Sequence, residues 1–167
     1  VKGYVDEIII VDTGSKDNTK EIAKKFTDKV FDFRWSDDFS VARNFSLSKA
    51  TKEWILVLDA DELLLESDLI KLREIIDKDE WDAIELIQRN YTDDSTKSVW
   101  KRVEENISEA KGYKGYGYNP IIRVIKNNLG MEYEGAVHEI LNPSIRRLGL
   151  KMIHTEIPIH HYYEEKI

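Results

Sequence analysis

The fold is decided by the segment Trp54-Ile55-Leu56-Val57-Leu58-Asp59-Ala60-Asp61-Glu62, in which an apolar run ends in carboxylates. A second run, Ile8-Ile9-Ile10-Val11, ends in Asp12 and the turn residues Thr13-Gly14-Ser15. Short runs of Ile, Val and Leu that end in turn residues are typical of buried parallel strands. Carboxylates at strand carboxyl ends face the crevice where open α/β sheets bind ligands. The two segments predict a site for a divalent cation and a polar ligand that carries phosphate.

Strand and helix patterns alternate around these segments over the first 90 residues. Such alternation predicts an α/β fold with a mostly parallel sheet and helices on both of its faces. Asp17 or Asn18, Asp37 or Asp38, and Asp61 or Ser67 are expected to cap the helices. The predicted strands cover 7–11, 30–33, 53–58 and 82–88. Two predicted helices run to about Lys29 and over 39–50, and the first has Ile22, Ala23 and Phe26 on its apolar face. A third helix follows Asp61 or Ser67, and its apolar positions include Leu69, Leu72, Ile75 and Ile76.

The pattern changes after Arg89. Residues 90–118 are polar and rich in Gly and Tyr, and a helix is expected around residues 99–110. Otherwise this stretch is a long connection, a kind of segment that often forms a lid. Further strands are expected at 119–125, 131–137 and 151–163, with a turn at 127–130.

Composition excludes several classes of function. The net charge of −7 and the pI of about 5.2 provide no basic footprint for nucleic acid. Without cysteine, thiol catalysis and cysteine-ligated zinc are excluded. A metal ion must therefore bind Asp, Glu or His, and an oxygen-rich site favours Mg²⁺ or Mn²⁺. No apolar run is long enough to span a bilayer and no signal peptide is visible, although the chain opens at Val1 without Met.

The carboxylates at the strand ends have two interpretations. Asp59 and Asp61 can hold one divalent cation and leave ligand positions open for a diphosphate. Alternatively, Asp61 caps the next helix and Asp59 is solvated. Asp12 accepts hydrogen bonds from a nucleoside, in a turn that exposes backbone N–H groups, or it serves only the turn.

Arg43 lies on the predicted helix between the two acidic segments. Its guanidinium can reach a phosphate or stack on a base, or it can be a surface arginine paired with Asp37 or Asp38. The segment around Asp12 contains neither Gly-x-Gly-x-x-Gly nor a Walker lysine motif. A dinucleotide cofactor and a P-loop ATP site are therefore not expected.

Taken together, these motifs resemble glycosyltransferase family 2 in their order and spacing. The close match runs over residues 5–65, and weaker matches extend it over nearly the whole chain. The segments that carry the resemblance are 12–19, 35–44, 54–62, 123–127, 133–139 and 161–162.

The resemblance implies a GT-A fold, the nucleotide-diphospho-sugar transferase type, and sugar transfer with inversion at the anomeric carbon. It implies one domain over 1–167, with a nucleotide-binding half (1–89) and an acceptor-side half (90–167). Asp12 would contact the base or ribose and Arg43 the nucleotide. Asp59 would lie near the ribose and sugar. Asp61 would bind the Mn²⁺ or Mg²⁺ that bridges the diphosphate.

The acceptor half supplies the candidate base. Glu139 best matches the late acidic residue that takes the acceptor proton in the family, and His138 is the second candidate. Otherwise these two residues only hold a loop. His161 is expected to complete the metal shell, while His154 and His160 are expected to be strand or surface residues. The four tryptophans are expected in the core, with Trp100, in the long connection, as the one candidate exception.

The expected donor is a nucleotide-diphospho-sugar and the expected acceptor a cell-envelope glycan, a lipid or a protein. A cytoplasmic location, at the membrane surface or away from it, is expected. Relatives begin with one more strand, so we expect the sheet here to lack its first strand. Two alternatives remain: a non-catalytic nucleotide- or partner-binding module of the same fold, and a sugar nucleotidyltransferase, whose Gly-rich signature is not visible.

Overall fold

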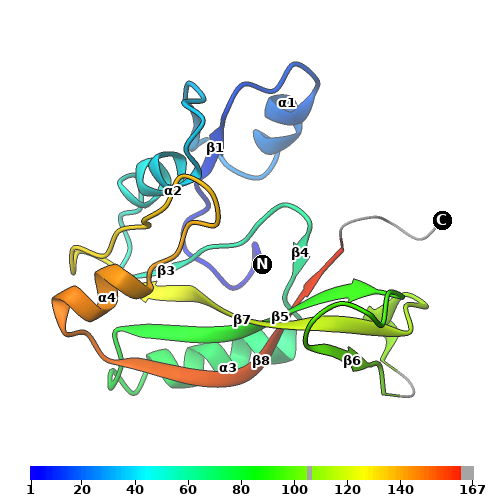
Figure 1. Ribbon diagram of the computed structural model, residues 1–167. Helices are drawn as coiled ribbons and strands as arrows, with labels where there is room; N and C mark the ends of the chain where they lie inside the picture. The colour runs from blue at the N-terminus through cyan, green and yellow to red at the C-terminus, as the bar shows by residue number, and fades with distance from the viewer. Residues whose placement is uncertain (105–106, 163–167) are drawn as a thin grey trace. The chain divides into compact units, whose positions relative to one another are not determined.

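The computed structural model describes residues 1–104 and 107–162 (Figure 1). The chain forms two compact units. The first unit comprises Val1–Ile55 and Ile125–Lys151. The second unit comprises Leu56–Val124 and the chain from Met152 onwards. No helix within the described residues has the length and apolar character that a membrane span requires.

In the first unit, strand and helix alternate as predicted. Strands β1 and β2 are parallel, and Asp12 lies opposite Asp32 at their ends. The expected carboxylate at the end of the first strand is therefore confirmed. The elements of this unit are β1 (Ile10–Asp12), α1 (Thr19–Ala23), β2 (Val30–Asp32), α2 (Phe39–Leu47), most of β3 (Trp54–Leu56) and α4 (Asn142–Leu148).

Of the two helices expected in this region, α2 begins as predicted and α1 is shorter than predicted. Asp38 caps α2 as predicted, because its carboxylate accepts the N–H of Val41 at 3.2 Å. Helix α1 ends at Ala23 rather than near Lys29. The chain turns at Thr27, whose hydroxyl donates to the carbonyl of Ile8 at 2.7 Å. Of the three residues predicted for the apolar face of α1, only Ala23 is buried.

The second unit contains most of a mixed sheet. Within the described residues this sheet has six strands in the order β3-β7-β5-β8-β4, and β6 pairs with β7. Strands β5 and β8 are parallel, whereas β4–β8 and β6–β7 are antiparallel (Figure 1). The elements are β4 (Glu62–Leu63), α3 (Glu66–Ile76), β5 (Ala83–Thr92), β6 (Trp100–Arg102), the 3-10 helix η1 (Ser108–Ala110), β7 (Gly115–Lys126) and β8 (Met152–His161).

Strand β5 lies inside this sheet between β7 and β8. Its residues are buried in nearly continuous succession, the pattern of a strand covered on both faces. Helix α3 buries Leu69 and Leu72 and begins after Leu65, so the prediction that Asp61 or Ser67 caps it is wrong. This leaves Asp61 in the turn that precedes β4.

Two predictions for the second half of the chain are wrong. The helix expected at residues 99–110 is replaced by β6 and η1, and residues 105–106 lie outside the described part. Strand β6 pairs with Gly115 and Gly117, and a Cβ at Gly115 would lie 2.1 Å from the Trp100 ring. The strand expected at residues 131–137 is a loop with one isolated bridge, Glu134 to Ile140. Helix α4 was not predicted, although Pro143 and Gly149 bracket it in the usual way.

Other expectations in this half are met. Strand β8 lies within the predicted residues 151–163, of which Tyr163 is outside the described part. The turn at 127–130 forms, with positive φ at Asn128 and Gly130. Trp35 is 37% exposed, so its predicted place in the core is wrong. Its ring instead packs edge-on against Phe39, 4.7 Å away between centroids.

Candidate active site

In the first unit, a turn closes around the carboxylate of Asp12. This carboxylate is buried at the end of β1 and accepts the N–H groups of Gly14 and Ser15, each at 3.1 Å. The expectation that the turn exposes these N–H groups is wrong, because both point at Asp12. Gly14 has a φ of +119°, a conformation that side chains rarely adopt.

The charge on Asp12 is supported by its surroundings. Hydrogen bonding from the Ser15 side chain lowers the pKa of Asp12 most, and the backbone N–H groups and the Lys20 charge act in the same direction against burial. The ammonium of Lys20 lies 3.7 Å from Asp12 and also pairs with Asp32 on β2. Asp12 is therefore an ionised acceptor at the carboxyl end of a parallel pair of strands.

Also in the first unit, the loop that follows Met131 docks on α2. Asn44 exchanges two hydrogen bonds with the backbone of Tyr133, at 2.8 and 2.9 Å, and the N–H of Phe39 donates to the carbonyl of Ala136 at 3.0 Å. These contacts bring together the predicted residues Arg43 and Glu139. The guanidinium Nε of Arg43 donates to Oε1 of Glu139 at 3.1 Å, and both side chains are mostly buried.

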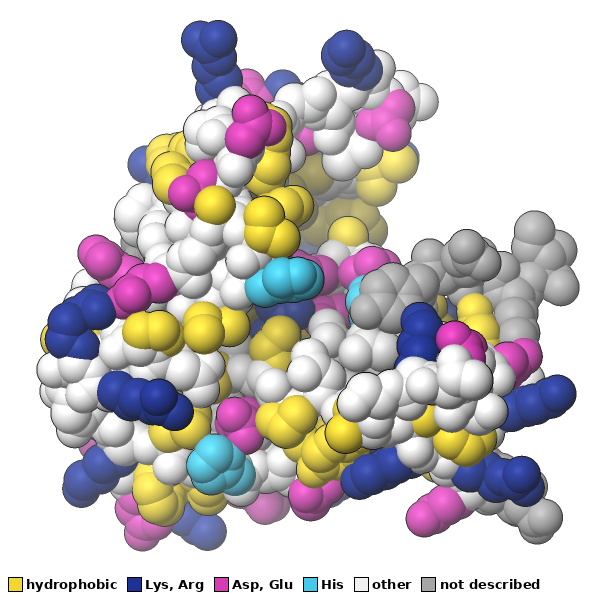
Figure 2. Space-filling view, in the orientation of Figure 1, with side chains coloured by type: hydrophobic (Ala, Val, Ile, Leu, Met, Phe, Trp, Pro, Cys, Tyr) yellow, Lys and Arg dark blue, Asp and Glu magenta, His cyan; other side chains and the backbone are white. Residues whose placement is uncertain are grey.

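Helix α2 and the docked loop also expose apolar side chains. Phe39 and Val41 of α2 and Val137 of the docked loop are each at least 45% exposed. Figure 2 shows hydrophobic side chains at the surface around α2.

In the second unit, Asp59 belongs to a buried network. Arg123 on β7 donates from Nη2 to Oδ2 of Asp59 at 2.7 Å and to Oε1 of Glu62 at 2.6 Å. Glu62 also accepts from Gln88 at 2.6 Å and from the N–H of Asp59 at 2.8 Å. The side chain of Glu62 is 0% exposed and that of Arg123 is 4% exposed. Asp59 is thus held by the guanidinium, while its side chain remains 32% exposed.

Asp61 faces His161 in the same unit. Strand β4 pairs with the end of β8 so that Glu62 lies opposite His161, and the N–H of Tyr162 donates to the carbonyl of Asp61 at 3.3 Å. This register puts Oδ2 of Asp61 3.1 Å from Nε2 of His161. The other ring nitrogen of His161, Nδ1, lies 2.6 Å from Oδ1 of Asn90.

The geometry of this pair fits a divalent cation. If Nδ1 carries the proton and donates to Asn90, then Nε2 presents a lone pair to the Asp61 carboxylate. A ligating histidine typically donates its other N–H to an oxygen acceptor in this way. Two ligands with bonds of about 2.1 Å at a right angle are separated by about 3 Å. Among the described residues no group of three or more His, Asp or Glu side chains could hold a metal ion. The described part of the chain offers Asp61 and His161 as a pair of donors here.

His154 and His160 both lie in β8, as expected. His160 is 1% exposed, and its Nδ1 lies 2.8 Å from the hydroxyl of Tyr91. Burial, followed by the charge of Arg89, lowers the pKa of His160. His154 is on the surface and pairs with Glu85.

Sequence reasoning assigned no role to Arg123, Glu62, Gln88 and Asn90. A signal for Arg123 was present, because it is a single charge inside the apolar run Ile121-Ile122-Arg123-Val124-Ile125. A buried charge of this kind requires a partner. The partner itself, 61 residues away, could not be read from the local pattern.

Comparison with known proteins identifies the family. The model of "Glycosyl transferase family 2" matches residues 2–137. A TPR repeat-containing protein of Synechococcus elongatus is 33% identical over 89% of this chain, and glycosyltransferase SunS of Bacillus subtilis is 31% identical over 83%. The chain spans about a third of these relatives, 32% and 29% of their lengths.

Solved structures show the same fold. The crystal structure of Staphylococcus aureus TarS residues 1–349 in complex with UDP-GlcNAc matches with a TM-score of 0.64 at 15% identity. The match covers 96% of this chain and 50% of that chain. The predicted GT-A fold is therefore confirmed, with a mixed sheet. Since the family model covers most of its residues, the chain belongs to glycosyltransferase family 2.

Proposed function

We propose that this domain transfers a sugar, with inversion, from a nucleotide-diphospho-sugar to the hydroxyl of a cell-envelope glycan, a lipid or a protein. The observation that carries the proposal is the pair formed by Asp61 and His161, two metal-binding groups 3.1 Å apart. Since the TarS structure contains UDP-GlcNAc, UDP sugars are the first donors to test.

Asp61 and His161 are the residues that would hold Mn²⁺ or Mg²⁺, the ions expected of this family. A carboxylate oxygen with an imidazole nitrogen suits Mn²⁺ better than Mg²⁺, which prefers oxygen ligands. A bound divalent ion would stabilise negative charge on the departing diphosphate. Asn90 orients the imidazole, and the antiparallel register of β4 with β8 keeps the two ligands together.

Asp12, Arg43 and Asp59 are proposed to serve the nucleotide and the sugar. Asp12 is ionised, and as a carboxylate it would accept hydrogen bonds from a ribose or a base. Arg43 supplies a positive charge for phosphate or a planar group for stacking. Asp59 is held by Arg123, which leaves the carboxylate in a defined orientation for a ribose or sugar hydroxyl.

Glu139 is proposed to be the general base. In the reaction the acceptor oxygen attacks the anomeric carbon as the bond from that carbon to the diphosphate breaks, and the hydroxyl proton passes to the carboxylate. The hydrogen bond from Arg43 fixes Oε1 of Glu139. This contact orients the carboxylate before the acceptor arrives, and orientation is a large part of catalytic rate.

The test uses the full-length protein with a panel of nucleotide sugars and acceptors, with and without Mn²⁺. Glu139→Gln keeps the shape of the side chain and removes its basicity. We expect transfer to slow by about 10²–10⁴-fold while the affinity for UDP stays unchanged, because the base acts mainly in the transition state.

Glu134→Gln is the matched control. Glu134 lies in the same loop but pairs with Arg147 on the surface, so its loss should leave transfer unchanged. If Glu139→Gln transfers sugar at the parent rate, Glu139 is not the base. Nucleotide binding without transfer from any donor would favour a non-catalytic module, and release of pyrophosphate would favour a nucleotidyltransferase.

A further inference from the structure

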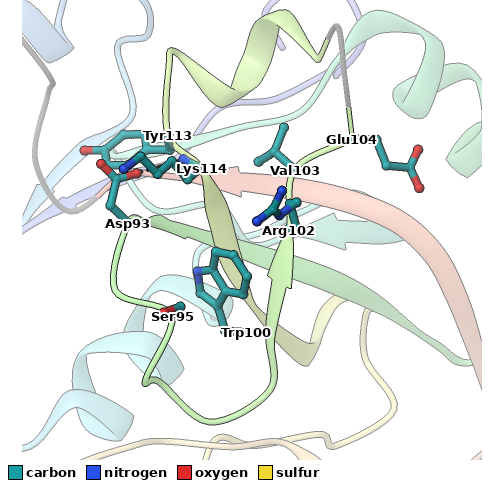
Figure 3. Close-up of a pocket in the computed structure, with 8 residues that line it drawn as sticks. All are labelled: Asp93, Ser95, Trp100, Arg102, Val103, Glu104, Tyr113 and Lys114. Atoms are coloured by element: carbon teal, nitrogen blue, oxygen red, sulfur yellow. Dashed lines mark hydrogen bonds between the residues drawn. The ribbon is translucent and has the colours of Figure 1, made fainter.

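A pocket of about 550 Å³ opens in the second unit, on the hairpin that β6 and β7 form. The described residues that line it are Asp93, Ser95, Trp100, Arg102, Val103, Glu104, Tyr113 and Lys114 (Figure 3). None of them belongs to the candidate active site. The volume suits a ligand of a few rings.

Trp100 forms a fixed wall of this pocket. Its indole Nε1 donates to the carbonyl of Thr92 at 3.2 Å. Its ring occupies the space that a side chain at Gly115 would need, since a Cβ there would lie 2.1 Å from the ring. The residue has intermediate burial, so part of the indole surface is exposed. A rigid aromatic face is therefore presented to the pocket.

Two other lining residues, Lys114 and Tyr113, are also held by contacts. Figure 3 shows Asp93, Tyr113 and Lys114 grouped together, and the carbonyl of Lys114 accepts the N–H of Val103, which follows β6, at 2.9 Å. The N–H of Lys114 donates to Oδ1 of Asp93 at 2.7 Å. The Tyr113 ring stacks on the buried Tyr91, with centroids 6.1 Å apart. The lining thus contains two aromatic residues, Trp100 and Tyr113, each held by a contact to the strand β5 region.

The charges of the lining identify the class of ligand. Asp93 and Glu104 balance Arg102 and Lys114, so the pocket favours neither an anion such as a phosphate nor a cation. Neutral ligands with many hydroxyls suit such a mixture, because carboxylates accept and guanidinium or ammonium groups donate. The apolar C–H face of a pyranose ring can pack on a tryptophan.

We propose that this pocket binds a carbohydrate, which stacks on Trp100 and is the acceptor chain of the transfer reaction. The acceptor role rests on the proposed function, whereas carbohydrate binding by the pocket does not. A pocket outside the catalytic residues would bind sugar units beyond the one that reacts. It would thereby favour an oligosaccharide over a monosaccharide as the acceptor.

The test is binding of four trisaccharides (chitotriose, cellotriose, maltotriose and mannotriose) to the full-length protein by saturation-transfer NMR and titration. We expect at least one of them to bind, and Trp100→Ala to weaken it at least tenfold, which corresponds to about 1.4 kcal/mol. Trp100→Phe keeps an aromatic face and should retain part of the affinity. UDP affinity should be unchanged in both variants.

Trp35→Ala removes another partly exposed tryptophan, in the first unit, and should not alter trisaccharide binding. Gly115→Ala provides a second route if Trp100→Ala fails to fold, since the new methyl group displaces the ring while keeping it in the chain. The proposal is overturned if no trisaccharide binds at 10 mM, on the order of the weakest sugar affinities, or if the binding survives loss or displacement of Trp100. Trisaccharide binding without sugar transfer would overturn only the acceptor role and the proposed function.

Discussion

At the scale of the residue, the arrangement of Asp61, His161 and Asn90 has a chemical consequence. The carbonyl oxygen of Asn90 favours the tautomer of His161 that carries its proton on Nδ1. In that tautomer Nε2 and the Asp61 carboxylate both present lone pairs, which repel one another. A metal ion bound between them would remove this repulsion. Asp61 is 53% exposed at its side chain, so a diphosphate in solution can reach it.

Replacing Asp61 by Asn should therefore separate metal-linked binding from folding. We expect the parent protein to bind UDP at least tenfold more tightly with Mn²⁺ present, and Asp61→Asn to lose this gain, because an amide is a much poorer ligand than a carboxylate. Calorimetry of UDP binding with and without Mn²⁺ measures the gain. Asp94→Asn, which changes an exposed turn carboxylate, should keep it. Equal gains in the parent and in Asp61→Asn would remove Asp61 from the metal site.

At the scale of the element, β7 places the guanidinium of Arg123 inside the sheet. Arg123 joins β7 to the segment before β4 through Asp59 and to β4 itself through Glu62, and Gln88 of β5 completes the network. Strands of one sheet are thus linked by side chains as well as by backbone. The network also fixes the segment that ends in Asp61. Breaking such a pair is costly because the remaining charge stays buried.

Arg123→Met should consequently destabilise the protein by about 3–5 kcal/mol, since Glu62 keeps a buried carboxylate without its guanidinium. Urea denaturation measures the free energy of unfolding. The double variant Arg123→Met with Glu62→Gln should recover part of the loss. Arg147→Met removes an exposed partner of Glu134 and should cost at most about 1 kcal/mol. A similar loss in the two single variants would contradict the role given to the buried network.

At the scale of the whole molecule, the described carboxyl groups with shifted pKa values all move in one direction. Each is lowered by hydrogen bonds to the ionised form. Glu7 shows the largest effect, because its ion pair with Lys29 and its bonds from Thr51 bring its pKa to about 2. Both hydrogen bonds from Thr51 are 2.9 Å long, and the Glu7 side chain is 7% exposed.

The contribution of Glu7 to stability should depend on pH with a defined sign. A folded pKa of about 2, below the unfolded value of 4.5, means that the contribution is complete above pH 4.5 and is lost as the pH falls towards 2. Glu7→Gln should lower the free energy of unfolding by roughly 1.5–3 kcal/mol at pH 7, and the difference from the parent should shrink below pH 4.5. Denaturation curves at pH 7, 5, 4 and 3 measure this difference.

Glu53→Gln is the control, since Glu53 is 72% exposed at its side chain and should have little effect at any pH. A Glu7→Gln difference that stays constant from pH 7 to pH 3 would show that the carboxylate charge is not what stabilises the protein.

Local sequence patterns predicted some of the strand ends and helix caps that carry the candidate site residues. The apolar run before Asp12 predicted a strand that ends there, and β1 does end at Asp12, because a strand needs only a few consecutive apolar side chains and a turn signal. The run before Asp59 predicted a strand over 53–58, whereas β3 ends at Leu56. The cap of α2 at Asp38 was also readable, since its bond to Val41 spans three residues. The order of the motifs was enough to identify the family. Predictions failed where the signal was not local: α1 is shortened at Thr27, and β6 forms because Gly115 makes room for Trp100.

Tertiary structure decided which of these groups meet. Arg43 and Glu139 are 96 residues apart, and Asp61 and His161 are 100 residues apart. Periodicity and capping act over a few residues, so they leave such pairings open. The docking of residues 133–141 on α2 and the register of β4 with β8 select one pairing for each. A shift of β8 by one residue would present His160 rather than His161 to Asp61, because neighbouring side chains on a strand point to opposite faces.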